Sequence, residues 1–221
     1  MDDYLSEKEQ WDWLKTQIMV NGPWIVAGIA AGALLLGGWH WWQARVDERA
    51  GQANALTRQV AQAFERGDRA RAQTILDTLT REQSKSPYLD QANLVAARAY
   101  VDLGELDKAA ARLTTVMDGT ADHALALVAR ERLARVQIAQ NKPDAALATL
   151  AAVDSGSFAA RFHAVRAEAY VAKKDSANAL KEYRAARAAD ASATLDPQTL
   201  ELQINDLVAD EPAPSAATGN K

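Results

Sequence analysis

The sequence predicts an all-α protein: a single N-terminal transmembrane helix, then an α-solenoid of about four helical hairpins and a C-terminal capping helix. Three observations predict this fold. All six tryptophans of the 221-residue chain lie in its first 42 residues, around one uncharged apolar run. The remainder is rich in alanine, leucine and charged residues and poor in glycine and proline, as helical domains are. Turn signals recur in this remainder at intervals of 37, 37 and 33 residues.

The apolar run extends from Trp24 to Trp42 and carries no charge. As a helix it measures about 27 Å, close to the ~30 Å hydrocarbon core of a bilayer. Tryptophans favour the two membrane interfaces, which is where the ends of this run would lie. We therefore expect an acidic tail over residues 1–20 and a transmembrane helix over residues 21–43.

A cleaved signal peptide is the alternative to this anchor. It requires a basic leading region and a small-residue cleavage site. Here the leading tail is acidic, and the run ends in Trp39-His-Trp-Trp, which suits a cleavage site poorly. The flanks carry nearly equal numbers of lysines and arginines, so the positive-inside rule does not orient the helix. Gly28 and Gly32 form a small-xxx-small pattern and are a candidate contact with another transmembrane helix.

The domain predicted over residues 44–208 contains four turns in a fixed register. The turns begin at Gly67, Gly104, Asn141 and Lys174. A small residue follows five positions later at Ala72, Ala109, Ala146 and Ala179, and a large one nine positions later at Leu76, Leu113, Leu150 and Tyr183. Glycine or asparagine at the turn supplies a left-handed helix end, and small residues let antiparallel helices approach closely.

These spacings resemble tetratricopeptide repeats from about Ala53 to Ala189. An ordinary antiparallel helical bundle is the alternative. Beyond the repeats, a helix from Pro197 to Val208 places Leu200, Ile204 and Leu207 on one face, as a capping helix requires. Residues 209–221 are rich in proline, alanine and serine, so we expect a disordered tail.

The sequence offers no pattern for catalysis, a metal or a cofactor. It has no cysteine, and its three histidines are scattered, without partners at metal-ligand spacing. It has no nucleophile elbow or phosphate-binding glycine loop. Outside the tail and the anchor there are 23 basic and 24 acidic residues, which argues against the clustered basic surface that nucleic acid needs. We therefore predict a protein that is not an enzyme and binds other proteins.

The first helices of stacked hairpins line a concave face that commonly binds peptides or helices. Apolar Val101, Ile138 and Val171, with Arg98 and Arg135 one turn earlier, predict an amphipathic groove for apolar and carboxylate groups. Alternatively, the three apolar side chains pack inside the solenoid or against the capping helix. The candidate groove residues are Leu94, Val95, Arg98, Val101, Arg132, Arg135, Ile138, Arg161, Val165, Glu168 and Val171, with Glu131 beside them.

Taken whole, the chain resembles the ancillary SecYEG translocon subunit family of proteobacteria. The residues that carry the resemblance are Asn21-Gly22 before the anchor, its glycines, Trp39-His-Trp-Trp at its exit and the repeat segment 99–111. The resemblance implies a bacterial inner-membrane protein with a cytoplasmic N-terminus and a periplasmic repeat domain. It implies the SecYEG translocon, a membrane-anchored peptidyl-prolyl isomerase-like chaperone and exported polypeptides as partners.

Three functions follow, in decreasing order of expectation. The first is a non-enzymatic, translocon-associated chaperone or adaptor. The second is a structural scaffold for another cell-envelope or cell-division complex, and the third is an enzyme. Within the resemblance, Gly28 and Gly32 would contact another single-span protein or a translocon helix, with a homodimer as the second choice.

Overall fold

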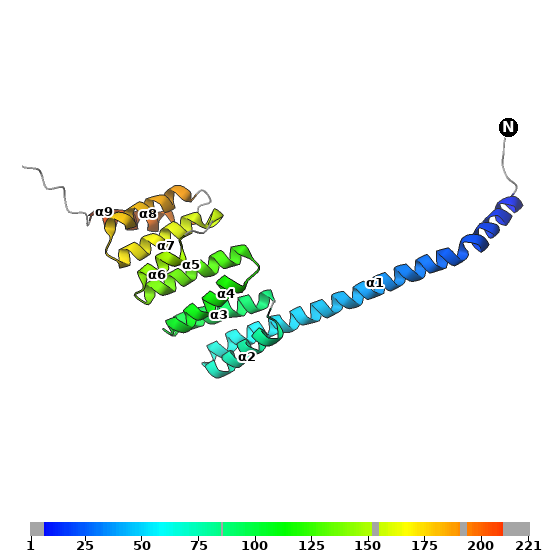
Figure 1. The fold of residues 1–221 in the computed structure, drawn as a ribbon, viewed down its shortest axis with the longest axis horizontal. Coiled ribbons are helices and arrows are strands. Elements are labelled where there is room, and N and C mark those ends of the chain that lie inside the picture. The colour runs from blue at the N-terminus through cyan, green and yellow to red at the C-terminus, as the bar shows by residue number, and fades with distance from the viewer. Residues whose placement is uncertain (1–6, 85, 152–154, 191–193, 210–221) are drawn as a thin grey trace, which may run out of the picture. The chain divides into compact units, whose positions relative to one another are not determined.

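The computed structural model describes residues 7–84, 86–151, 155–190 and 194–209, all of them helical or in connecting turns. They divide into two compact units, Met1–Gln52 and Ala53–Lys221. The helices are α1 (Glu7–Glu65), α2 (Arg69–Glu82), α3 (Pro87–Asp102), α4 (Leu106–Gly119), α5 (His123–Ala139), α6 (Pro143–Thr149), α7 (Ala159–Ala172), α8 (Ser176–Ala189) and α9 (Pro197–Ala209), with a 3-10 turn at Gly156–Phe158. The predicted all-α fold of four hairpins and a final helix is confirmed (Figure 1).

The N-terminal unit consists of the first part of α1. Pro23 lies inside this helix, and its two parts, Trp11–Trp24 and Val26–Glu65, meet at a bend of 42°. Proline causes such bends because it lacks an N–H and its ring clashes with the preceding turn. Among the described residues no single helix is long and apolar enough to cross a membrane, and this bent pair meets only the length and composition that a span needs. The membrane span over residues 21–43 therefore stays a prediction.

The repeat unit contains all four predicted turns. Gly67, Gly104, Asn141 and Lys174 have φ angles of 73°, 74°, 59° and 61°. At the second turn, the Glu105 N–H donates to the Tyr100 carbonyl at 2.8 Å and the Gly104 N–H to the Val101 carbonyl at 2.9 Å. The other three turns repeat this pair of hydrogen bonds, which is the Schellman motif that ends many helices.

The predicted register describes the core of the hairpins. The small residues Ala72, Ala109, Ala146 and Ala179 are completely buried. The large residues Leu76, Leu113, Leu150 and Tyr183 are at most 3% exposed. Alanines thus lie where two helices cross closely, and one large side chain per hairpin fills the space beside them. Aspartate or serine side chains cap several helix starts; Asp122, for example, accepts from the Ala124 and Leu125 N–H groups.

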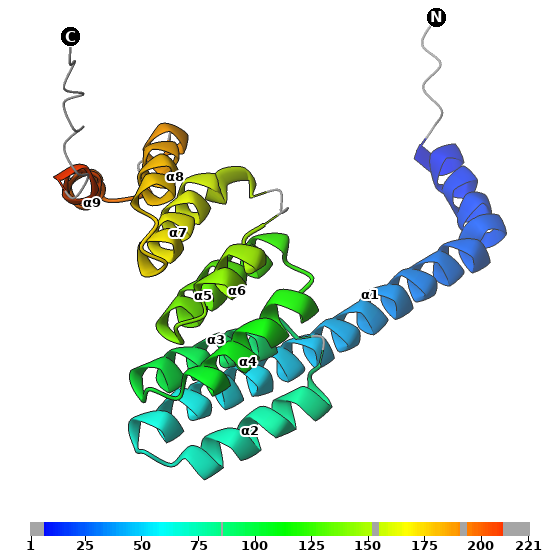
Figure 2. The ribbon, with the colours of Figure 1, turned by 60° about the vertical axis from the view of Figure 1, so that its left-hand side comes forward.

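The hairpins stack so that successive helices pack on one another, notably α3 on α4, α4 on α5 and α7 on α8 (Figure 2). The end of α1 belongs to this stack, because the Thr57 hydroxyl donates to the Tyr88 carbonyl of α3 at 3.1 Å. At the other end, α9 covers α8 with Leu200 and Ile204, as predicted for a cap. The predicted disordered tail begins at Ala209, which ends α9; residues 210–221 lie outside the described part, as do residues 1–6 of the predicted N-terminal tail.

Candidate functional site

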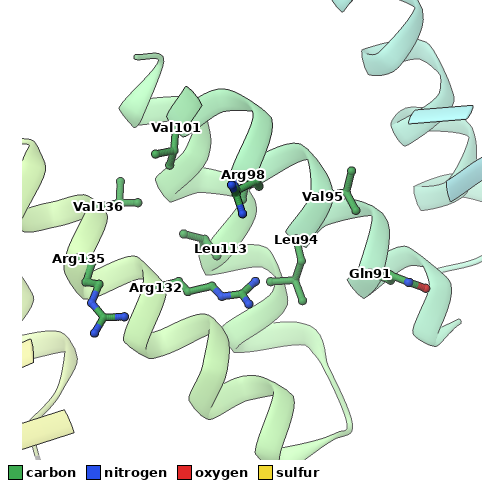
Figure 3. A pocket seen from close by; sticks show the side chains of 10 residues that line it. Gln91, Leu94, Val95, Arg98, Val101, Leu113, Arg132, Arg135 and Val136 are labelled. Carbon is green, nitrogen blue, oxygen red and sulfur yellow. The ribbon is translucent and has the colours of Figure 1, made fainter. Parts of the chain in front are cut away.

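A depression of about 650 Å³ lies where α3 and α5 face each other above α4 (Figure 3). Six predicted groove residues line it: Leu94, Val95, Arg98, Val101, Arg132 and Arg135. Four further residues that the sequence did not single out for binding also line it: Gln91, Ala97, Leu113 and Val136. Six of the residues around this depression were therefore predictable from the sequence, whereas its floor was not. That the depression binds a partner stays a prediction.

The bottom of this depression is apolar and its rim is polar. Leu113 of α4 is 2% exposed and Val136 of α5 is 6% exposed, so both form the floor. Leu94 and Val95 are half-buried on α3, and Val101 is 40% exposed at the rim. A site with a buried apolar base and a few charged groups above it is typical of peptide-binding grooves.

The three arginines at the rim differ in their partners. Arg98 lies 3.4 Å from Asp102 in a pair whose side chains are both mostly exposed. Arg135 pairs with Glu131 at 2.7 Å and with Glu168 of α7 at 3.4 Å. Arg132 has no ion pair or hydrogen bond with any residue in the described ranges. In Figure 3, Arg132 extends from α5 towards Leu94 of α3, whereas Arg135 points away from the depression. Arg98 lines the depression from α3.

An ion-pair network joins the first helices of the third and fourth hairpins. The Glu131 carboxylate, with its side chain only 5% exposed, lies between Arg135 and Arg161, which is 3.7 Å away. Glu168 extends the network on α7. Arg161 and Glu168, both predicted to line the groove, therefore lie in a network that connects helices instead of in the depression.

Three predicted apolar groove residues also lie elsewhere. Val165 is fully buried in the cluster formed with Leu127, Leu150 and Phe162, so its prediction as a groove residue was wrong. Ile138 is half-buried against the same cluster. Val171 is 45% exposed on α7 but does not line the depression. Helix α7 is packed by α5, α6 and α8, which leaves it no single open face.

A second, smaller depression of about 320 Å³ adjoins the first one. Val95 and Arg98 line both, so α3 forms the ridge between them. Phe64, at the end of α1, contributes an apolar wall, and Glu65 and Asp102 contribute carboxylates. Within the described part of the chain, no group of three or more histidine or acidic side chains is placed to hold a metal ion.

Gly28 and Gly32 lie on α1, and a side chain added at either position would meet no atom within 4 Å. Both positions are therefore open to a neighbouring helix. Their contact with a partner stays a prediction.

Comparison with known proteins places this chain in a family. The model of the tetratricopeptide repeat-like domain matches residues 13–209. MamA from Desulfovibrio magneticus RS-1 and a MamA double mutant are structural neighbours at 18% and 17% identity. Each likeness covers 71% of this chain and 94% or 93% of the other, with a TM-score of 0.48.

Curated relatives match nearly end to end. The Escherichia coli protein named ancillary SecYEG translocon subunit is 30% identical over 94% of this chain and 99% of its own length. The proteins of that name from Haemophilus influenzae and Neisseria gonorrhoeae are 26% and 29% identical, over 92% and 83% of this chain and 98% and 88% of their own lengths. Since both the repeat register and these full-length matches agree, the chain belongs to the ancillary SecYEG translocon subunit family.

Proposed function

We propose that this protein is a non-enzymatic, membrane-anchored adaptor associated with the Sec translocon, and that it binds partner proteins or newly exported chains in the periplasm. The observation that carries the proposal is the depression between α3 and α5, with its buried apolar floor and arginine rim. The names of the full-length relatives supply the association with the translocon. A membrane-anchored peptidyl-prolyl isomerase-like chaperone is a further proposed partner.

Anchoring in the inner membrane is part of this proposal. It is supported by the apolar run between Trp24 and Trp42, whose side chains are largely exposed in α1 and have no core of their own to enter. Such exposure of large apolar side chains is expected where lipid or another helix covers them. Because the chain contains no cysteine, single cysteines at Lys15 and Ala111 can report the topology. The proposal requires labelling of Ala111→Cys, but not Lys15→Cys, from the periplasmic side of spheroplasts.

A photo-crosslinker at Gln91 tests the groove, because this exposed side chain lines the depression without forming its floor. Asp118, exposed on α4 outside the depression, is the matched control position. We expect crosslinks from Gln91 to exported chains or to translocon-associated proteins in intact cells, and few from Asp118. A single stable envelope partner unrelated to the translocon would instead support a structural scaffold. Equal crosslinking from both positions would contradict binding in the groove.

A further inference from the structure

We propose that the groove binds an acidic amphipathic segment of a partner protein, with a carboxylate between Arg98 and Arg132 and apolar side chains over Leu94 and Leu113. This inference rests on the proposed function and specifies the chemistry of the partner at that same site. Its occupant is defined by two features together: apolar residues on one face, and an acidic residue next to them.

The lining of the depression is positively charged. None of its ten lining residues is acidic, whereas three are arginines. The charge of Arg135 is balanced by Glu131 and Glu168. Arg132 has no ionic partner in the part of the chain that the structure describes. The depression therefore presents at least one unbalanced positive charge beside an apolar floor.

Arg98 is a second cation, and it can exchange its partner Asp102 for a carboxylate of the ligand. Its pair with Asp102 is 3.4 Å long, and the two side chains are 80% and 61% exposed. Exposed pairs of this kind contribute little, typically about 0–1 kcal/mol, because water solvates both partners well. A carboxylate from a ligand can accept from Arg98 and Arg132 together, and charge-assisted hydrogen bonds to two guanidinium groups are stronger than one exposed pair.

The neighbouring depression influences on which side of Arg98 an acidic group of the ligand lies. Its lining includes the carboxylates of Glu65 and Asp102, which repel an acidic group. Only α3, with Val95 and Arg98, separates the two depressions. An acidic residue of the ligand is therefore favoured on the α5 side of Arg98, beside Arg132, and disfavoured on the α1 side.

The apolar part of the depression favours a peptide over a simple anion. Leu113 and Val136 form a buried base in a space of about 650 Å³, which lies within the usual range for binding sites that accept several side chains. A helix or extended segment that inserts apolar residues there covers the partly exposed side chains of Leu94, Val95 and Val101, which water now contacts. An anion without an apolar part gains nothing from this floor.

The full-length protein in detergent micelles and three helical peptides test the inference. The peptides share leucines at positions i, i+3, i+4 and i+7 and differ at one adjacent position, which is glutamate, glutamine or lysine. By fluorescence anisotropy at low salt, we expect the glutamate peptide to bind about three- to tenfold more tightly than the glutamine peptide, and the lysine peptide to bind most weakly. High salt should reduce the preference for glutamate.

Arg132→Gln should remove most of the glutamate preference while the glutamine peptide binds as before. Arg184→Gln on α8 is the matched control, since Arg184 is exposed and lies outside the depression. Circular dichroism should show the same helical content and melting for both variants. Loss of the preference in both variants, or in neither, overturns the inference.

Other outcomes separate this inference from the proposed function. Equal binding of the glutamate and glutamine peptides, with crosslinks from Gln91 intact, overturns the acidic preference and leaves the groove as a binding site. No binding of any peptide also overturns the inference. Displacement of the glutamate peptide by phosphatidylglycerol vesicles, but not by phosphatidylcholine vesicles, would assign Arg98 and Arg132 to a lipid headgroup and overturn the inference.

Discussion

Glu131 and Arg135 lie one turn apart on α5, and their side chains meet at 2.7 Å. The glutamate is buried, whereas the arginine is 45% exposed. Arg161 from α7 approaches the same carboxylate, so a buried negative charge joins two hairpins. Glu131 thus differs from a glutamate in a surface ion pair, because its removal leaves two arginines without their shared partner.

We expect Glu131→Gln to lower the free energy of unfolding by about 1–2 kcal/mol. Loss of one partner of a buried pair costs up to 3–5 kcal/mol, but the partial exposure of both arginines lets water compensate in part. Glu201→Gln is the control, because Glu201 pairs with Arg187 at the surface. The control should change stability by less than about 0.5 kcal/mol in urea unfolding. Similar losses in both variants would contradict a special role for the buried carboxylate.

The crossing position Ala146 should not accept a large side chain. It lies on α6 and is completely buried in a cluster with Leu127 of α5 and Phe162 of α7, so we expect Ala146→Phe to destabilise the domain by about 1–3 kcal/mol or more. Ala148→Phe makes the same change on the exposed side of the same helix and should alter the melting temperature little. An unchanged melting temperature for Ala146→Phe would contradict the repeat register.

The left-handed turn residues predict two opposite effects. Gly104→Ala should destabilise by about 1–2 kcal/mol, because its φ of 74° disfavours any side chain although the surrounding space is open. Lys174→Gly should stabilise by up to about 1 kcal/mol, since Lys174 adopts a φ of 61° without being glycine. Gly119→Ala, at a helical position with open space, is the control and should not destabilise. Denaturant midpoints measure all three, and equal losses in the two turn variants would contradict this account.

Alkaline pH should weaken the domain through Tyr183. Burial and the nearby charge of Glu168 raise the pKa of Tyr183 to about 12, although Arg135 opposes the shift. In the unfolded chain the same phenol titrates near pH 10. The folded state therefore holds this proton more tightly, and its contribution is complete below pH 10 and lost between about 10 and 12.

The expected loss is on the order of 2–3 kcal/mol. Phenolate absorbance at increasing pH should show one late-titrating tyrosine that is missing in Tyr183→Phe. Urea unfolding should show a smaller alkaline loss for that variant than for the native sequence. The same late titration in Tyr183→Phe would assign the shift to another tyrosine.

The small residues of α1 predict a contact that can be separated from groove binding. Gly28→Leu with Gly32→Leu should still insert into membranes, because leucine favours insertion and the added side chains meet no atom of this chain. Co-purification of the translocon partner in mild detergent should decrease, since bulky side chains block close helix approach. Ala30→Leu, on the opposite side of the helix, is the control. Undiminished co-purification would assign recognition to the repeat domain alone.

The repeats could be predicted because each turn combines a residue tolerant of the left-handed conformation with small and large residues at fixed distances. Lys174 was found by spacing alone, and its positive φ confirms that the register matters more than the residue type. The anchor and tail boundaries rest on composition. The third hairpin was predicted to resemble the others, but α6 has only seven residues.

The groove was predicted only in part, because its floor comes from a second helix. The register identified Leu113 only as the large residue of its hairpin, and the structure adds that it lies at the base of an open depression. Val165 was misplaced because α7 is packed on several sides, so no apolar stripe distinguishes its outer face. The partners of Glu131 and Arg135 depend on distances between helices, which spacing along one chain does not give.

The shortness of α6 has a consequence for cooperativity. Its seven residues make only about two turns, and the described core is divided into three clusters instead of one. In stacked repeats, each layer is stabilised mainly by its neighbours, so a thin layer transmits less of that stabilisation. Heat or denaturant need not melt such a stack in one step. Hydrogen exchange should therefore be fastest around α6, where the stack can open locally while the hairpins on either side stay folded.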